Sequence, residues 1–126
     1  MKSIILILLI SCGLALAHHS ESGGYDRTRT VEMKATIVTV SFANPHASFE
    51  ADVEGVRWVF QLAAPSALMQ YQGWTRSTLK EGDVVTVTAY LEKKGARQAY
   101  PQFITLPNGA RMTNVDGWEM QGKTGK

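Results

Sequence analysis

The chain has 126 residues, which is enough for one domain with one hydrophobic core. Its 13 lysines and arginines nearly balance 11 acidic residues, and no basic run marks a stripe for phosphates, so the composition argues against nucleic-acid binding. The single cysteine, Cys12, excludes an internal disulfide.

Residues 1–17 have the three parts of a secretory signal peptide. Lys2 supplies the positive start, residues 4–10 form an apolar run, and the Ala-Leu-Ala sequence at 15–17 suits cleavage. The apolar run is too short to span a bilayer, so we expect no transmembrane helix. Cleavage after Ala17 would place a bacterial protein in the periplasm or outside the cell, with His18 as its first residue.

Cys12 gives this segment a second interpretation. The sequence from Leu9 to Gly13 resembles a bacterial lipobox, in which the cysteine is lipidated and becomes the N-terminus. The protein would then be held at a membrane surface by a lipid anchor. Because the apolar run before Cys12 would be very short, we expect ordinary cleavage after Ala17.

The next elements in the chain are an N-terminal arm and a long first strand. Residues 18–29 are polar and contain glycine, which is typical of an arm. Residues 31–37 alternate between apolar and polar side chains, as in a half-buried strand. The apolar positions then shift to Val38, Val40 and Phe42, and such a shift predicts a β-bulge or a strong bend.

A β-hairpin is predicted after the Asn44-Pro45 corner. Residues 47–53 and 56–62 both alternate, and Glu54-Gly55 is a turn signal between them. A two-residue turn there pairs Phe49 with Phe60 on the core face. It also pairs Asp52 with Arg57 on the solvent face, so the side chains support this register.

The second half of the chain predicts a helix and further strands. Pro65 at the first turn and Gly73 past the end indicate a short helix over 65–73. Residues 84–91 and 99–106 read as strands, and Pro101 places an edge or a bulge in the latter. A hairpin turn at 108–109 leads to a short strand at 110–112, and residues 122–126 are expected to form a disordered tail.

This order of elements predicts an all-β fold. Residues 30–121 are expected to form a small OB-like five-stranded barrel with one short helix between strands three and four. A β-sandwich is the alternative, because the order of the strands does not determine whether a barrel closes.

Several segments form a specific combination: His18-His19-Ser20, Tyr25-Asp26, Asn44-Pro45-His46-Ala47, Gly73-Trp74-Thr75-Arg76, residues 79–87 and Leu106-Pro107-Asn108-Gly109. They resemble a family of small secreted bacterial proteins that is catalogued only as a domain of unknown function. The resemblance covers nearly the whole chain after residue 17 and implies an exported protein with no assigned activity. Residues 90–100 depart from the pattern, since Leu-Glu-Lys-Lys replaces a looser connection containing glycine and proline, so an extended hairpin is expected there.

The three histidines, His18, His19 and His46, are the candidate metal ligands. After cleavage, the amine and imidazole of His18 would chelate a metal together, and a third nitrogen would complete the arrangement called a histidine brace. His46 is the distant candidate for that nitrogen, His19 is a further one, and nitrogen ligands suit copper. The alternative is that all three are solvated histidines of an arm and a turn.

Other residues favour binding over catalysis. Trp74, which follows the predicted helix, and Arg76 are the candidate ligand-binding residues at the rim of a cleft, whereas Trp58 is expected in the core. The scattered methionines fit packing better than ligation of Cu(I). The sequence has no G-x-S-x-G or H-E-x-x-H motif and no cysteine beyond residue 17, so we expect no enzyme.

Together these observations predict an exported small binding protein with an unknown ligand or envelope-protein partner. The first hypothesis is that it binds copper through His18 and His46. The alternative is a metal-free module that binds a peptide, a glycan or a protein of the cell envelope. Such a module would use the open face of the barrel and the loop that carries Trp74.

Overall fold

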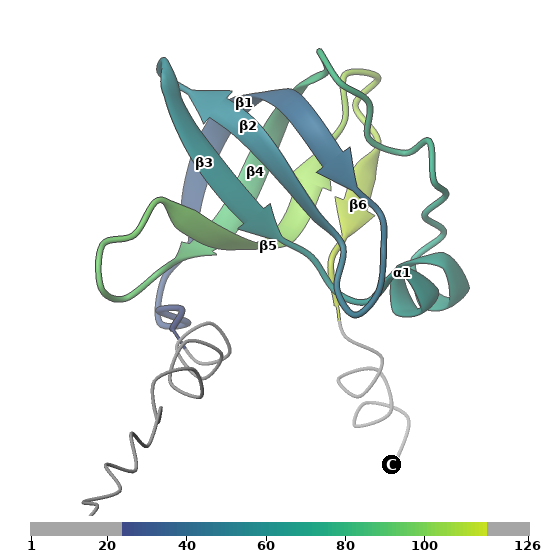
Figure 1. Cartoon of the computed structure of the whole chain (residues 1–126), viewed down its shortest axis with the longest axis horizontal. Helices are drawn as coiled ribbons and strands as arrows, with labels where there is room; N and C mark the ends of the chain where they lie inside the picture. The colour runs from purple at the N-terminus through teal and green to yellow at the C-terminus, as the bar shows by residue number, and fades with distance from the viewer. Residues whose placement is uncertain (1–23, 116–126) are drawn as a thin grey trace, which may run out of the picture.

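The computed structural model describes residues 24–115, which fold into six strands and one short helix (Figure 1). The bounds of these elements are β1 Val31–Ser41, β2 Ser48–Val53, β3 Val56–Gln61, α1 Pro65–Tyr71, β4 Val84–Leu91, β5 Gln98–Thr105 and β6 Arg111–Thr113. The predicted signal peptide at 1–17 and tail at 122–126 lie outside the described residues. Within residues 24–115, no helix is long and apolar enough to cross a membrane.

Five of the strands close into a barrel. The strands are hydrogen-bonded in the order β3-β2-β1-β4-β5-β6, and β3 pairs in addition with β5. The β3–β5 pair is parallel and brings Phe60 opposite Ala99, whereas the other pairs are antiparallel. This closure, with α1 between β3 and β4, confirms the predicted OB-like barrel and excludes the sandwich.

β1 is long enough to pair with two strands because it bends. Its first half pairs with β4, its second half pairs with β2, and Thr36 lies opposite a residue in each partner. The pairing with β2 shifts register between Ile37 and Thr39, which confirms the predicted irregularity at Val38. Met33, Ala35 and Ile37 point into the core before the bend.

The β2–β3 hairpin has the predicted register. Phe49 lies opposite Phe60, and their buried rings stack with a centroid distance of 4.7 Å. On the outer face, Arg57 Nε donates to Asp52 Oδ1 at 2.6 Å. This hydrogen bond raises the pKa of Arg57 above its usual value. The two predicted faces of the hairpin are therefore confirmed.

The helix and the last strands follow the predicted turn signals closely. Pro65 lies in the first turn of α1, Leu68 is fully buried, and Gly73 has φ +73° just beyond the end. In β5, the pairing with β4 shifts register beside Pro101, so the proline lies at a bulge. β5 also pairs with β6 and β3, and it is therefore not an edge strand.

The β4–β5 connection, residues 92–97, folds back on the side chain of Glu92. Glu92 Oε2 accepts hydrogen bonds from the backbone N–H groups of Lys94, at 2.9 Å, and Ala96, at 2.8 Å. The backbone N–H of Glu92 donates to the carbonyl oxygen of Gln98 at 3.0 Å. These bonds hold the connection at one end of the barrel.

One buried polar side chain joins three parts of the fold. Asn114, which follows β6, is 3% exposed. Its Oδ1 accepts from the backbone N–H of Ala63 at 2.7 Å, and its Nδ2 donates to the carbonyl oxygen of Pro101 at 2.7 Å. The side chain thereby links the segment after β6 to β5 and to the connection between β3 and α1.

Candidate functional site

His46 lies in the connection between β1 and β2. This connection turns at a cis Asn44-Pro45 bond and places His46 on the surface, just before β2. The histidine lines a hollow of about 270 Å³ on the outer side of β2, β3 and β5. The other side chains around this hollow, called the His46 hollow below, come from Tyr25, Pro45, Ala47, Ser48, Val59, Gln61 and Gln98.

Tyr25 reaches the His46 hollow from the N-terminal segment. An isolated β-bridge pairs it with Glu92, and the backbone N–H of Asp26 donates to the carbonyl oxygen of Leu91 at 2.8 Å. The Tyr25 hydroxyl donates to Gln61 Oε1 at 3.1 Å. Residues 24–26, within the predicted N-terminal arm at 18–29, therefore pack against the barrel.

The residues after Tyr25 turn the chain into β1. The side-chain hydroxyl and the backbone N–H of Thr28 both donate to the Asp26 carboxylate. These bonds lower the pKa of that carboxyl, and the hydroxyl has the larger effect. The Arg27 guanidinium lies over the rings of Tyr90 and Tyr100, at 5.5 and 5.3 Å from their centroids. These contacts fix the direction of the chain as it leaves the His46 hollow.

This arrangement bears on the other predicted metal ligands. His18 and His19 lie outside the described residues, but Gly24, the first described residue, is next to a residue that lines the His46 hollow. The six residues from 18 to 24 span at most about 20 Å when extended. The length of the chain therefore allows His18 to meet His46.

The described part of the chain contains no complete metal site. Within residues 24–115, no three His, Cys, Asp or Glu side chains gather closely enough to hold a metal ion. His46 contributes one imidazole, and its polar neighbours Tyr25, Gln61 and Gln98 offer only phenol and amide groups. A copper site at this place needs further nitrogen ligands from residues before Gly24.

The structure corrects the prediction for Trp74. Its side chain is 2% exposed, and the indole N–H donates to the carbonyl oxygen of Thr113 at 2.9 Å. An indole in this position is part of the core and cannot stack on a ligand. Arg76 is exposed and donates from Nη1 to the carbonyl oxygen of Phe42 at 3.4 Å, so it contacts the connection that carries His46.

Trp58 differs from its prediction in the opposite direction. It points inward, as the alternation in β3 predicts, but it is only half-buried. The reason is its place near the start of β3, where the barrel ends in an open pocket lined in part by Met33 and Leu91. Sequence reasoning finds the inward face of a strand but not the point at which the barrel stops.

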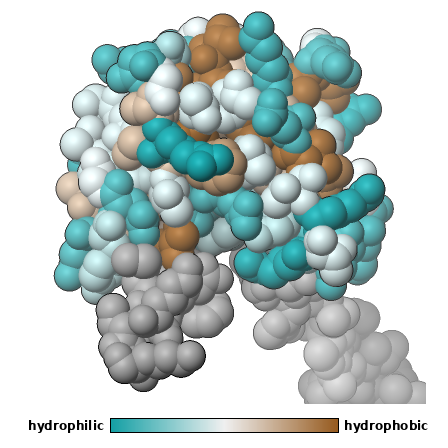
Figure 2. Space-filling model, turned by 180° about the vertical axis from the view of Figure 1, so that it is seen from behind, coloured by the Kyte–Doolittle hydropathy of each residue, from teal (hydrophilic) through white to brown (hydrophobic). Residues whose placement is uncertain are grey.

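Exposed apolar side chains also occur outside this pocket. Figure 2 shows the face opposite to that of Figure 1, where hydrophobic side chains reach the surface between polar ones. Among residues 24–115, the most exposed large apolar residues are Met69 and Tyr71 in α1 and Val84 at the start of β4. Single exposed apolar residues of this kind are ordinary on a small domain and do not mark a site.

The fold and its surface define a class of protein: a small OB-like barrel with a polar hollow on the β2–β3 side, the side with which many OB folds bind ligands. The profile of a family described as "Family of unknown function (DUF6152)" matches residues 7–101, so the chain belongs to that family. This confirms the resemblance to a family of unknown function. A comparison with curated proteins finds no match.

Proposed function

We propose that this protein is exported and binds Cu(II) through the mature N-terminal residue His18 together with His46. The observation that supports this is the position of Tyr25, which brings the N-terminal segment to the hollow that His46 lines. The copper site would thus be formed by the mature N-terminus, which carries His18, and by the β1–β2 connection, which carries His46. The role proposed is binding rather than catalysis.

The chemistry of the site depends on where the chain is cut. A free amine and an imidazole on His18 form a chelate with Cu(II), whereas an amide nitrogen at the same position does not offer the amine lone pair. His46 supplies the third nitrogen, and His19 offers a fourth. Cu(II) stands at the top of the divalent affinity series for such ligands.

The first expected result concerns the mature end of the protein. We expect intact mass spectrometry of exported material to give the mass of residues 18–126, because the Ala-Leu-Ala sequence precedes His18. An Ala17→Glu variant is expected to retain the full chain, since a large charged residue blocks recognition of the site. A diacylglyceryl adduct on Cys12 would overturn the proposed cleavage and indicate a lipid anchor.

The second expected result concerns the copper ligands. A competition titration with Cu(II) compares the mature protein, a form with one glycine added before His18, and His46→Ala. Loss of a ligand is expected to weaken binding by about 100-fold, because even changes outside the coordination shell cost about 10- to 100-fold. His19→Ala tests the fourth nitrogen, and thermal unfolding checks that each variant is folded.

Protons should compete with copper for the same nitrogens. The affinity is therefore expected to fall as the pH falls, and the three forms should converge at acid pH. The copper proposal is wrong if the extended form and His46→Ala both bind like the mature protein.

The second candidate function is a metal-free interaction module of the cell envelope. It is favoured by the polar character of the His46 hollow, where Ser48, Gln61 and Gln98 offer hydrogen-bonding groups on the side used by OB folds. A peptide, a glycan or an envelope protein would suit such groups. The copper titration separates the two functions, because this module predicts the same weak copper binding in all variants.

A further inference from the structure

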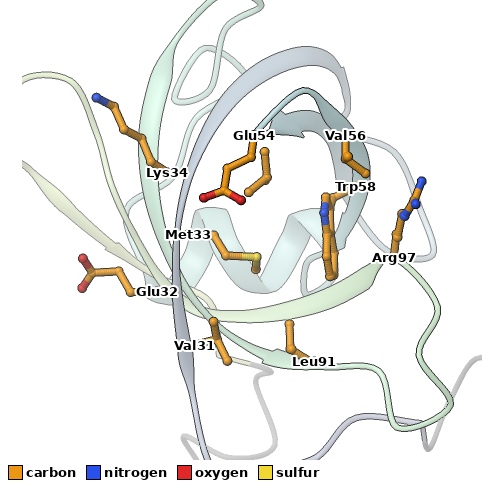
Figure 3. Close-up of a pocket in the computed structure, with 10 residues that line it drawn as sticks. Val31, Glu32, Met33, Lys34, Glu54, Val56, Trp58, Leu91 and Arg97 are labelled. Carbon is orange, nitrogen blue, oxygen red and sulfur yellow. The ribbon is translucent and has the colours of Figure 1, made fainter.

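The barrel has an open end that is separate from the His46 hollow. Figure 3 looks into this end, with α1 visible behind the far end of the barrel. The opening, called the barrel mouth below, holds a pocket of about 520 Å³. Its apolar walls come from Val31, Met33, Val53, Val56, Trp58 and Leu91. The barrel mouth and the His46 hollow share no lining residue.

Four charged residues, Glu32, Lys34, Glu54 and Arg97, also line this pocket, and they differ in where their side chains point. In Figure 3 the carboxylate of Glu54 lies within the outline of the barrel mouth, whereas the side chains of Arg97 and Lys34 point away from it. Within residues 24–115, the Glu54 carboxylate forms no ion pair and no hydrogen bond that would neutralise it. The pocket is lined by two acidic and two basic residues, but Glu32, like Lys34 and Arg97, points away from the opening, so the charge that lies over it is that of Glu54.

The backbone of Glu54 is unusual as well. Its φ is +50°, and it is the one residue other than glycine with positive φ in the described range. This left-handed conformation is unfavourable for a glutamate, and glycine, asparagine or aspartate would suit the turn better. The turn therefore holds a long carboxylate at the barrel mouth in a conformation that the backbone alone does not favour.

We propose that the barrel mouth binds a small organic cation with an apolar body, such as a substituted ammonium ion. The Trp58 ring offers a π face to the cation, and the Glu54 carboxylate offers the opposite charge. The apolar walls would receive the hydrocarbon part of the ligand. A neutral or anionic ligand of the same size would cover the carboxylate without neutralising it, which is unfavourable. This inference does not depend on copper binding.

The test uses three probes of similar size on the mature protein: benzyltrimethylammonium, benzyl alcohol and phenylacetate. A titration followed by the backbone and indole N–H signals in NMR gives the affinity and the place of binding. We expect benzyltrimethylammonium to bind more tightly than either control and to shift the signals of Trp58 and Glu54. Added salt should weaken this binding.

Glu54→Gln removes the charge and keeps the size of the side chain. We expect it to weaken binding of benzyltrimethylammonium by about twofold to fivefold, which is the range of an exposed cation–π or ionic contact. Glu81→Gln, in the exposed turn before β4, is the matched control and should bind like the wild type. His46→Ala should also bind like the wild type, which separates this site from the proposed copper site.

Three outcomes would overturn the proposal. The first is equal binding of benzyl alcohol and benzyltrimethylammonium, which would show a pocket without charge preference. The second is the same affinity in Glu54→Gln and Glu81→Gln. The third is the absence of binding by all three probes while the protein remains folded.

Discussion

Phe60→Ala is expected to lower the free energy of unfolding by about 3–5 kcal/mol, the range for removing a buried aromatic side chain. Phe60 is fully buried and stacks on Phe49. It also lies at the parallel pairing of β3 with β5, which closes the barrel. The change therefore removes core contacts at the place where the sheet joins itself. Chemical denaturation of the mature protein measures the effect.

The matched control for Phe60→Ala lies three residues earlier in the same strand. Arg57 points outward, and its ion pair with Asp52 is half exposed, so solvent screens it. Arg57→Ala should therefore change the free energy of unfolding far less than Phe60→Ala does. Equal effects of the two substitutions would contradict the assignment of inner and outer faces in β3.

The sequence predicts this hairpin well because the relevant information is local. A two-residue turn determines the register of the strands on either side. The alternation of side chains checks this register on two faces, the core face and the solvent face. The pairs of Phe49 with Phe60 and of Asp52 with Arg57 both follow. The same holds for α1, where Pro65 and Gly73 mark the two ends.

Contacts between distant residues are harder to predict. Trp74 follows a helix in a polar loop, which favours an exposed position, but its backbone N–H donates to the carbonyl oxygen of Leu68 at 3.1 Å and its side chain is buried. The partner of its indole N–H is Thr113, which is 39 positions away in the sequence. No local pattern around residue 74 reveals that partner, and so the expectation of an exposed rim residue is wrong.

In the candidate site, too, local patterns are predicted from the sequence and contacts between distant residues are not. The Asn44-Pro45 corner predicts that His46 is exposed beside a strand, and the structure places it so. Its neighbour Tyr25 stands in a polar, glycine-containing stretch with no strand pattern. Tyr25 is nevertheless held by Glu92, which follows it by 67 positions, and by Gln61. The hollow therefore depends on pairings that only the folded chain brings together.

Asn114 is a further residue that the sequence does not single out, and its replacement gives the second large expected effect. Asn114→Asp keeps the shape of the side chain but replaces the Nδ2 donor with an oxygen that faces the carbonyl oxygen of Pro101. At neutral pH this buries a carboxylate beside an acceptor. We expect a loss of about 2–4 kcal/mol in the free energy of unfolding at pH 7.

The effect of Asn114→Asp should depend on pH in a definite direction. Burial raises the pKa of the new carboxyl in the folded state above its unfolded value of about 3.9. Below the unfolded value the protonated acid donates to Pro101 and accepts from Ala63, as the amide does. The unfolded state loses its proton first as the pH rises. Stability should therefore fall by about 1.4 kcal/mol per pH unit until the folded pKa is passed, and then level off.

Asn114→Leu is the control that separates charge from the loss of hydrogen bonds. Leucine has the same branching and the same number of side-chain heavy atoms but cannot titrate, and it leaves the backbone N–H of Ala63 and the carbonyl oxygen of Pro101 without their partner. Its destabilisation relative to the wild type should be the same across the pH range. Urea unfolding at pH 3.5, 5 and 7 compares the variants. If Asn114→Asp and Asn114→Leu lose stability in parallel at all three pH values, the carboxyl at position 114 has the same pKa in the folded and unfolded states, which would contradict its burial beside the carbonyl oxygen of Pro101.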